Sequence, residues 1–296
     1  MIWNGSITAM VTPFTEDSSA VDYECLEKLI QRQIDAGTDG VVIMGTTAEA
    51  PTATFEEEDE ILELAIRMAK GRMKIISGMN GNVTVDTVTN IRSILKHDID
   101  GIMVTCPFYN KPSQNGIIAH YSTLAQETDL PMMIYNVPGR SGMNIAVDTM
   151  LRLHEMHPHI SGVKEASGQY DQIAETVRAF SGSSFQVMAG DDSMVLPTMA
   201  LGGTGVVSVL SNLYPEVVKS IVEAMKNSDL PKASAQYLRY LPLMKGIFIG
   251  GNPAGIKALM AHQGLLNNTF RLPIVAQTPE ETRQLLAIHD AVMAAG

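Results

Sequence analysis

The stretch GVVIMGTTAEAPTATFEEEDEILELAIRMAKGRMKIISG, residues 40–78, places two short β-rich runs on either side of a helical pattern. The runs GVVIMG and MKIISG lack the alternation of a half-solvated strand, which predicts strands buried on both faces, as in a parallel sheet. Between them, Thr54 and Glu57 have the spacing of a capping box at a helix start. Apolar residues then recur at helical spacing, at Ile61, Leu62, Ala65 and Met68. The stretch therefore predicts a strand–helix–strand unit.

The same alternation recurs along most of the chain. Eight strand candidates, separated by amphipathic segments, begin at Ser6, Gly40, Met73, Gly101, Pro131, Ile160, Phe185 and Thr204. An alternation sustained eight times predicts a (β/α)8 TIM barrel more readily than a doubly wound open sheet. Residues from about 228 onward contain several helical patterns and no strand candidate. We therefore expect a catalytic barrel domain over residues 1–227 and a helical C-terminal domain over residues 228–296.

The composition narrows the class of protein. The 296 residues are 45% hydrophobic and 18% charged, which is a globular balance with ample material for a core. No apolar run reaches the roughly 18–20 residues that span a bilayer, and the N-terminus lacks the basic start of a secretory signal, so we expect no membrane partner. The two cysteines, Cys25 and Cys106, suit a reducing cytoplasm. A net charge of −11 argues against a nucleic-acid partner, which would need a basic face.

In such barrels the chemistry takes place where strands end and the following loops begin. The sixth strand candidate ends in GVKEAS, residues 162–167, and so places Lys164 at this edge. The residue is either a surface lysine with a solvated ammonium or an amine at the barrel mouth. Partial burial lowers the pKa of a lysine, and a neutral amine attacks carbonyl groups to form a Schiff base. Position alone leaves both readings open.

Other strand ends carry hydroxyls, a phenol and a cation. The second strand is expected to finish in Thr46 and Thr47, which are either ordinary strand threonines or hydroxyls that hold a carboxylate or pass a proton. Tyr135 finishes the fifth strand, either as a core aromatic or as a proton relay beside Lys164. Arg140 follows a Pro-Gly turn, either as an exposed loop charge or as a fork for a substrate carboxylate.

The remaining candidates do not indicate a metal or a nucleotide. Tyr109, in FYNKP, either packs within its own loop or reaches a neighbouring site. Asp191 and Asp192 follow the seventh strand and are expected to cap the next helix rather than to bind metal. None of the seven histidines falls at a strand end, and the cluster HEMHPH, residues 154–159, precedes the sixth strand. No phosphate-binding glycine motif follows a strand. We therefore expect no metal and no cofactor.

Six motifs, taken in order, resemble those of the dihydrodipicolinate synthase family. They are GTTAEA (45–50), FYNKPSQNG (108–116), YNVPGRSG (135–142), GVKEASG (162–168), AGDDSM (189–194) and GGTGVVSV (202–209). The resemblance extends over the whole chain, through NPAGIKALM and RLP. It implies a barrel of the N-acetylneuraminate lyase superfamily, whose members form a lysine Schiff base with pyruvate. The implied reaction is the metal-independent condensation of pyruvate with L-aspartate 4-semialdehyde in lysine biosynthesis.

The resemblance also implies the catalytic residues. Lys164 would form the Schiff base, and Tyr135, Thr46 and Tyr109 would relay protons, with Tyr109 donated by a neighbouring subunit. Enamine formation requires removal of a proton from the pyruvate methyl group, which a phenol beside the imine can mediate. Family members are commonly homotetramers built as dimers of dimers, so the expected partners are the two small substrates and further copies of the chain.

Substrate-binding residues follow from the same resemblance. Thr47 would hold the pyruvate carboxylate, and Arg140 would hold the carboxylate of aspartate semialdehyde. Gly190 and Val207 would line the pyruvate pocket through backbone groups. The Val-Pro-Gly-Arg element that contains Arg140 favours the synthase over sugar-acid lyases.

The chain departs from the family pattern at several positions. Ala48 stands where glycine is usual, and GGNPAGIK differs from the usual acidic-x-Asn-Pro-Ile-Pro-Val-Lys. The positions of the family's lysine-effector site are occupied by Ala50, Phe55, Glu58, Asn82, Asp86 and Phe108. Two histidines, a tyrosine and a glutamate of lysine-inhibited members are thereby replaced. We expect weak or absent inhibition by L-lysine.

Two other functions are compatible with the sequence. One keeps the imine but releases pyruvate, as an aldolase or lyase acting on a 2-keto-3-deoxy sugar acid or on 4-hydroxy-2-oxoglutarate. The departures at Ala48 and in GGNPAGIK leave this function open. The other is a regulator that binds pyruvate or an amino acid without turnover. The intact relay residues argue against it.

Overall fold

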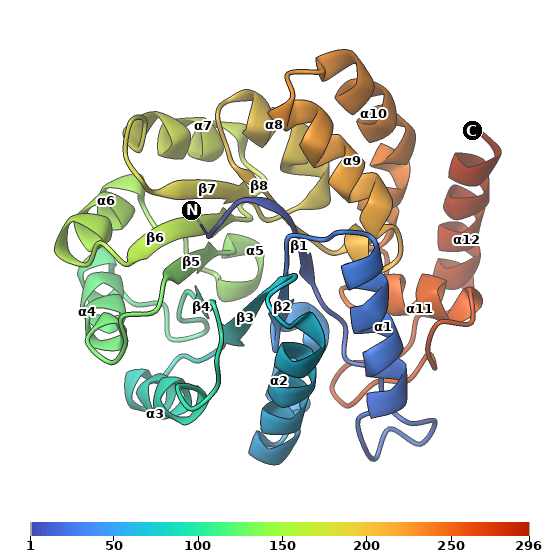
Figure 1. The fold of residues 1–296 in the computed structure, drawn as a ribbon, viewed down its shortest axis with the longest axis horizontal. Helices are drawn as coiled ribbons and strands as arrows, with labels where there is room; N and C mark the ends of the chain where they lie inside the picture. Colours follow the sequence, from blue (N-terminus) through green and yellow to red (C-terminus); the bar gives the residue numbers. More distant parts are fainter. Residues whose placement is uncertain (1, 296) are drawn as a thin grey trace.

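The computed structural model describes residues 2–295 and contains a closed barrel of eight parallel strands in sequence order (Figure 1). The strands are β1 (Gly5–Ala9), β2 (Gly40–Ile43), β3 (Lys74–Met79), β4 (Gly101–Thr105), β5 (Met132–Asn136), β6 (Ile160–Glu165), β7 (Gln186–Ala189) and β8 (Gly205–Ser208). Pairing of β1 with β8, with Ile7 opposite Val207, closes the barrel. The predicted (β/α)8 fold is confirmed.

Helices follow the strands and form the outer layer of the barrel (Figure 1). They are α1 (Tyr23–Asp35), α2 (Phe55–Ala69), α3 (Thr84–Ile94), α4 (Gln114–Ala125), α5 (Pro138–Ser141), α6 (Val147–Met156), α7 (Tyr170–Ala179), α8 (Val195–Ala200) and α9 (Pro215–Lys226). Short 3-10 turns are η1 (Thr46–Ala48), η2 (Ala50–Thr52), η3 (Asp192–Met194) and η4 (Leu210–Asn212). The predicted capping box is present, because Thr54 and Glu57 exchange side-chain and backbone hydrogen bonds at the start of α2.

The chain after α9 is helical, as expected. It contains α10 (Leu230–Gly246), α11 (Ala254–His262) and α12 (Pro279–Ala294). The helix α10 packs against both α9 and α12. In Figure 1 these elements, coloured orange to red, lie along one side of the barrel. Lys257 in α11 bonds to Thr12 and Glu49, so the C-terminal part of the chain contacts the loops after β1 and β2.

Two apolar cores hold the fold together. The larger one lies between the strands and the surrounding helices, and a smaller one fills the barrel interior with residues such as Ile7, Val42, Ile76, Met103 and Met188. Inward-facing residues of neighbouring strands stack in layers, as is usual in such barrels. The barrel interior is therefore filled by side chains.

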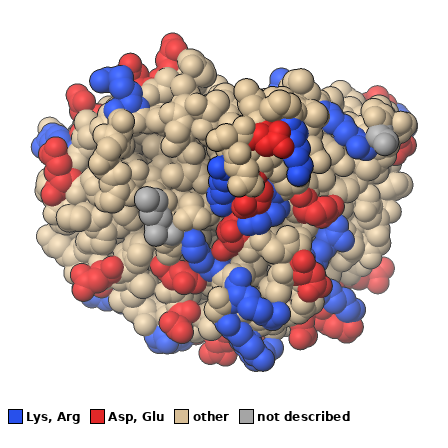
Figure 2. Space-filling model, turned by 45° about the horizontal axis from the view of Figure 1, so that its top comes forward, with Lys and Arg blue, Asp and Glu red and all other residues tan. Residues whose placement is uncertain are grey.

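The surface is mixed in charge. On the face shown in Figure 2, Lys and Arg side chains lie next to Asp and Glu side chains in small groups. Within residues 2–295 the helices are all too short or too polar to cross a membrane.

Trp3 closes the amino-terminal end of the barrel. Its indole is fully buried, its Nε1 donates to Ser161 Oγ at 2.9 Å, and its main-chain N–H donates to Gln186 Oε1 at 2.9 Å. A Cβ atom at Gly101 or Gly162 would lie 2.6 Å or 2.5 Å from the indole. Both strands therefore need glycine where they pass this ring.

We predict that Trp3→Ala lowers the free energy of unfolding by about 3–5 kcal/mol, because it leaves a cavity under the barrel. Urea unfolding at one fixed protein concentration measures the change. Leu238→Ala is the control, because Leu238 is 63% exposed and its truncation should cost less than about 0.5 kcal/mol. Equal effects of the two substitutions would contradict the role given to Trp3.

Candidate active site

Lys164 and Tyr135 lie side by side at the carboxyl end of the barrel. They are paired in the register of β5 and β6, and both side chains are buried, with Lys164 only 4% exposed. The Lys164 Nζ lies 4.2 Å from the centroid of the Tyr135 ring. Within residues 2–295 this amine has no hydrogen bond or ion pair to another side chain. The structure thus holds a buried amine beside a phenol ring, with its donors available to a ligand.

The ends of β5 and β6 are tied together on the other face of the sheet. Glu165 is fully buried and accepts hydrogen bonds from Asn136 Nδ2 at 2.9 Å and from the Ser167 N–H at 2.8 Å. Burial raises the pKa of the Glu165 carboxyl, although these hydrogen bonds act against the shift. Asn136 in turn accepts from the Ile145 N–H at 3.0 Å. These bonds fix the strand ends that carry Tyr135 and Lys164.

Thr46 and Thr47 do not finish the second strand, so that expectation is wrong. The strand β2 ends at Ile43, and Met44 then takes a left-handed conformation with φ 58°, which breaks the strand. The threonines lie in the turn η1 that follows, where the Gly45 carbonyl accepts from the Ala48 N–H at 3.1 Å. Both threonine hydroxyls are therefore carried by a loop beyond the strand end and not by the strand itself.

Ala48 fits this turn without backbone strain. It is buried, and the positive φ of the loop, 57°, falls on Glu49 instead. A side chain at position 48 therefore requires no left-handed backbone. Alanine at position 48 is therefore compatible with the conformation of this loop.

Arg140 and Thr46 line one cavity of about 170 Å³ at the strand ends. Arg140 is exposed and follows Pro138 and Gly139, as expected, and the turn that they form is the single-turn helix α5. The cavity wall also includes Val137, two residues beyond Tyr135, and Thr105, which pairs with Tyr135 in the β4–β5 register. The cavity thus opens beside the strand end that carries the phenol.

Two polar residues of this cavity were missed by the sequence analysis. Thr105 Oγ1 donates to Asn80 Oδ1 at 3.0 Å, and Asn80 Nδ2 donates to the Met44 carbonyl at 2.7 Å. Asn80 therefore holds the backbone just before the Thr46–Thr47 turn. Asn80 directly follows β3, and the rule that site residues lie where strands end would have identified it.

The sequence of this chain matches that of known enzymes over nearly its full length. The family described as Dihydrodipicolinate synthetase family matches residues 3–292. The chain belongs to this family. A curated relative from Aquifex aeolicus, 4-hydroxy-tetrahydrodipicolinate synthase, is 41% identical over 284 residues, covering 96% of each chain.

Solved structures agree with the family assignment. Dihydrodipicolinate synthase from Aquifex aeolicus has a TM-score of 0.93 at 40% identity, covering 97% of each chain. The 4-hydroxy-tetrahydrodipicolinate synthase of Methylacidiphilum fumariolicum has a TM-score of 0.95 at 35% identity, covering 98% of this chain and 96% of that one. A dihydrodipicolinate synthase from Acinetobacter baumannii, crystallised with pyruvate, has a TM-score of 0.94 at 32% identity, covering 98% and 99%.

The two expected backbone positions of the family's pyruvate pocket are neighbours here. Gly190 directly follows β7, and its N–H donates to the Glu165 carbonyl at 2.8 Å. A Cβ at Gly190 would lie 2.5 Å from the Ala166 Cβ, so the close approach requires glycine. The β7–β8 pairing ends with Ala189 opposite Val206, and Gly190 and Val207 are the residues that directly follow this last pair.

Asp191 and Asp192 do not cap the helix that follows them. Asp192 is buried and accepts from the Ser208 hydroxyl and from the Val209 and Leu210 N–H groups at 2.9 and 3.0 Å. It therefore organises the loop after β8, and burial raises its pKa. Neither residue makes a side-chain cap to its own helix. Burial raises the pKa of Asp191 to about 6, and the positive charges of Lys164 and Arg140 act against that shift.

Tyr109 lies in the loop between β4 and α4. Its side chain is 88% exposed and its φ is 70°, a left-handed value that is rare for a tyrosine. Phe108 beside it lines the 170 Å³ cavity, whereas Tyr109 does not. The described residues therefore do not place Tyr109 in the site of its own subunit.

The expected effector residues are only partly brought together. Ala50, Phe55, Glu58 and Phe108 line a second cavity of about 430 Å³, next to the first one. Burial raises the pKa of Glu58. Asn82 and Asp86 are not part of this cavity wall. The Asn82 carbonyl instead accepts from Asn110 Nδ2 at 2.7 Å, which ties its loop to the one that carries Tyr109.

Potential metal ligands are scattered. Among residues 2–295 no group of three or more His, Cys, Asp or Glu side chains is arranged to hold a metal ion. In the HEMHPH segment, His154 Nδ1 lies 2.8 Å from the Ile160 carbonyl, within the chain's own fold.

We predict that Asp191→Asn changes the pH dependence of stability. A carboxyl whose pKa rises from 3.8 to about 6 on folding binds more protons when folded, so this group destabilises the fold progressively from about pH 4 to pH 6. The variant should therefore gain stability relative to the parent across this window, by at most about 3 kcal/mol. Urea unfolding at pH 4, 5, 6 and 7 measures the gain. A difference between the two proteins that does not change with pH would contradict the prediction.

Proposed function

We propose that this protein condenses pyruvate with L-aspartate 4-semialdehyde to 4-hydroxy-tetrahydrodipicolinate, a lyase reaction of lysine and diaminopimelate biosynthesis. The observation that carries the proposal is the buried amine of Lys164 beside Tyr135, within a chain of the dihydrodipicolinate synthetase family. The curated relatives bear the name of that enzyme. No observation favours a sugar-acid lyase.

In the proposed reaction, Lys164 Nζ adds to the carbonyl carbon of pyruvate, and water leaves to give an imine. Loss of a proton from the methyl group converts the imine to an enamine, whose carbon then attacks the aldehyde carbon of the second substrate and regenerates an imine on Lys164. The amino group of the second substrate then adds to the imine carbon, which closes the ring, and the bond to Lys164 Nζ breaks to release the product and the free amine. The burial of Lys164 supports this role, because a dry site keeps water from hydrolysing the imine. The adjacent Tyr135 phenol is proposed to carry the protons, with the Thr46 hydroxyl next in the relay.

A hydroxyl group and a guanidinium group are proposed to bind the carboxylates of the two substrates. Thr47, buried in η1, would donate its hydroxyl hydrogen to the pyruvate carboxylate. Arg140 would bind the carboxylate of the aldehyde, since a guanidinium offers a planar fork of donors. Its exposure at the mouth of the 170 Å³ cavity suits a group that meets the second substrate as it enters. Backbone groups of Gly190 and Val207 are proposed to line the pyruvate pocket.

We propose that the site is completed by a second subunit. Tyr109 is 88% exposed, and Asn110 beside it bonds to the Asn82 carbonyl, next to the exposed Val83 and Val85. The exposed Phe55 lines one cavity together with Phe108. Exposed apolar residues grouped in this way mark an interaction surface. The proposed occupant is another copy of the chain, in a dimer that forms half of a homotetramer.

The location and the domain boundary are also proposals. Both Cys25 and Cys106 are unpaired, which suits the cytoplasm. We place the boundary between the barrel and the helical C-terminal domain after residue 227, between α9 and α10.

The central prediction is a covalent adduct. Treating the protein with pyruvate and borohydride should reduce the imine and leave a mass increase on the peptide that contains Lys164. Lys164→Ala should lose the adduct and lower kcat in the coupled assay with aspartate semialdehyde by at least about a thousandfold. Lys28→Ala, which removes an exposed surface lysine, should leave both unchanged. An adduct on another lysine would contradict the assignment.

The shared site predicts complementation. Tyr109→Phe should lower kcat by at least about tenfold. Co-refolding equal amounts of Tyr109→Phe and Lys164→Ala chains should restore about one quarter of the parent activity, because half of the dimers are hybrids and each hybrid has one intact site. Activity no higher than the average of the two variants would show that Tyr109 acts in its own subunit or not at all.

Inhibition by L-lysine should be weak or absent. The cavity next to Phe55 and Glu58 lacks the histidines and the phenol of lysine-inhibited members, so fewer groups are available to bind the effector. Titration of the coupled assay with L-lysine measures this. Submillimolar inhibition would show that the site binds lysine in another way.

A further inference from the structure

Asn252 contacts both of the residues proposed to bind substrate carboxylates. Its Nδ2 donates to Thr47 Oγ1 at 2.9 Å, and its main-chain carbonyl accepts from Arg140 Nη2 at 3.4 Å. Asn252 is buried and precedes α11, whereas Thr47 and Arg140 lie on the loops after β2 and β5. A single residue from the C-terminal part of the chain therefore bridges the two loops at the mouth of the site.

The direction of the Asn252–Thr47 bond matters. A hydroxyl has one hydrogen to donate, and it can also accept through its oxygen. Here the oxygen of Thr47 accepts from Asn252, and no other side-chain hydrogen bond of Thr47 occurs within residues 2–295. The hydroxyl hydrogen is thereby left for a ligand. With its amide in this orientation, Asn252 holds the Thr47 oxygen in place and leaves the hydroxyl hydrogen free to turn toward a ligand.

A second contact stabilises the loop that carries Thr47, at Glu49, two residues after Thr47. Lys257 Nζ donates to Glu49 Oε1 at 2.8 Å, with both side chains fully buried. The ammonium also donates to the Thr12 carbonyl at 3.1 Å and lies within 4.6 Å of the ring centres of Phe14 and Phe270. Burial lowers the pKa of Lys257, although Glu49 acts against that shift.

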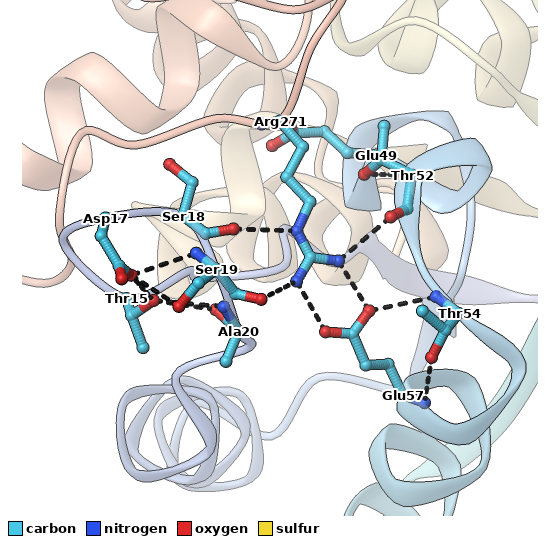
Figure 3. Close-up of polar contacts among 10 residues, drawn as sticks. All are labelled: Thr15, Asp17, Ser18, Ser19, Ala20, Glu49, Thr52, Thr54, Glu57 and Arg271. Atoms are coloured by element: carbon cyan, nitrogen blue, oxygen red, sulfur yellow. Dashed lines mark hydrogen bonds and ion pairs between the residues drawn. The ribbon is translucent and has the colours of Figure 1, made fainter.

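Arg271 holds the outer end of the loop, as Figure 3 shows. Its main-chain N–H donates to the other oxygen of Glu49 at 3.2 Å, and its guanidinium binds the Glu57 carboxylate through two 2.6 Å bonds. The remaining guanidinium hydrogens reach the carbonyls of Ser18, Ser19 and Thr52. All five guanidinium hydrogens therefore have a protein partner, so Arg271 has a structural role and no hydrogen left to bind a substrate.

We propose that Asn252 is a positioning residue that aims the Thr47 hydroxyl at the pyruvate carboxylate, with the Glu49–Lys257 and Glu49–Arg271 contacts holding the loop against it. This inference rests on the proposed function, because it takes Thr47 as the residue that binds pyruvate. Asn252 acts through Thr47 and does not itself touch the reacting atoms. The GGNPAGIK segment, despite its departure from the family pattern, thereby retains the contacts that the site needs.

The test compares Asn252→Ala with Asn252→Asp in steady-state kinetics. Alanine removes the donor to Thr47. The KM for pyruvate should therefore rise about tenfold, which corresponds to the loss of one hydrogen bond. Aspartate keeps the shape but accepts the Thr47 hydrogen and adds a negative charge, so that KM should rise about a hundredfold. The KM for aspartate semialdehyde should change less than about threefold, because the contact to Arg140 uses the main chain. Asn268→Asp, at an exposed asparagine in the same part of the chain, is the matched control and should leave both KM values unchanged.

A double-mutant cycle separates positioning from a structural role. On a Thr47→Ala background, Asn252→Ala should leave the KM for pyruvate within about twofold, because the group through which it acts is gone. An additive rise would overturn the proposal, as would single variants with an unchanged KM for pyruvate or an equal rise in both KM values. Borohydride trapping of the parent protein distinguishes failure of the proposed function from failure of the positioning role alone. If the parent forms no pyruvate adduct, the proposed function fails. If the parent forms one and the Asn252 variants bind pyruvate normally, only the positioning role fails.

Discussion

The candidate site depends on the register between β5 and β6, which pairs Tyr135 with Lys164. Side chains alternate between the two faces of a strand, so a shift by one residue would turn the amine away from the barrel interior. Buried hydrogen bonds between Asn136 and Glu165 stabilise this register from the opposite face. The same pair of strands thus carries the reacting groups on one side and their support on the other.

The second constraint is a contact between distant parts of the chain. The loop that bears Thr47 consists of two short 3-10 turns around a left-handed Glu49. Hydrogen bonds from Asn252, Lys257 and Arg271 tie this loop to the C-terminal part of the chain. The helical C-terminal part of the chain therefore contributes to the candidate site, because its residues hydrogen-bond to the loop that carries Thr47.

Much of the fold could be predicted from local sequence patterns. Eight buried strand runs and the Thr54–Glu57 capping box are local signals, and all are present in the structure. The position of Lys164 followed from counting strands. The exact location of Thr46 and Thr47 did not, because a left-handed Met44 ends β2 early and methionine gives no sign of that conformation. The contacts of Asp192 and Asn252 could not be predicted either, because their partners lie 16 to 18 and 205 residues away in the sequence.

The most direct test is a crystal structure of the protein soaked with pyruvate. We predict continuous electron density from Lys164 Nζ to the second carbon of pyruvate, with the carboxylate within hydrogen-bond distance of the Thr47 hydroxyl and the Tyr135 phenol beside the new bond. Pyruvate bound without a link to Lys164, or joined to a different lysine, would contradict the central claim that this buried amine performs the chemistry.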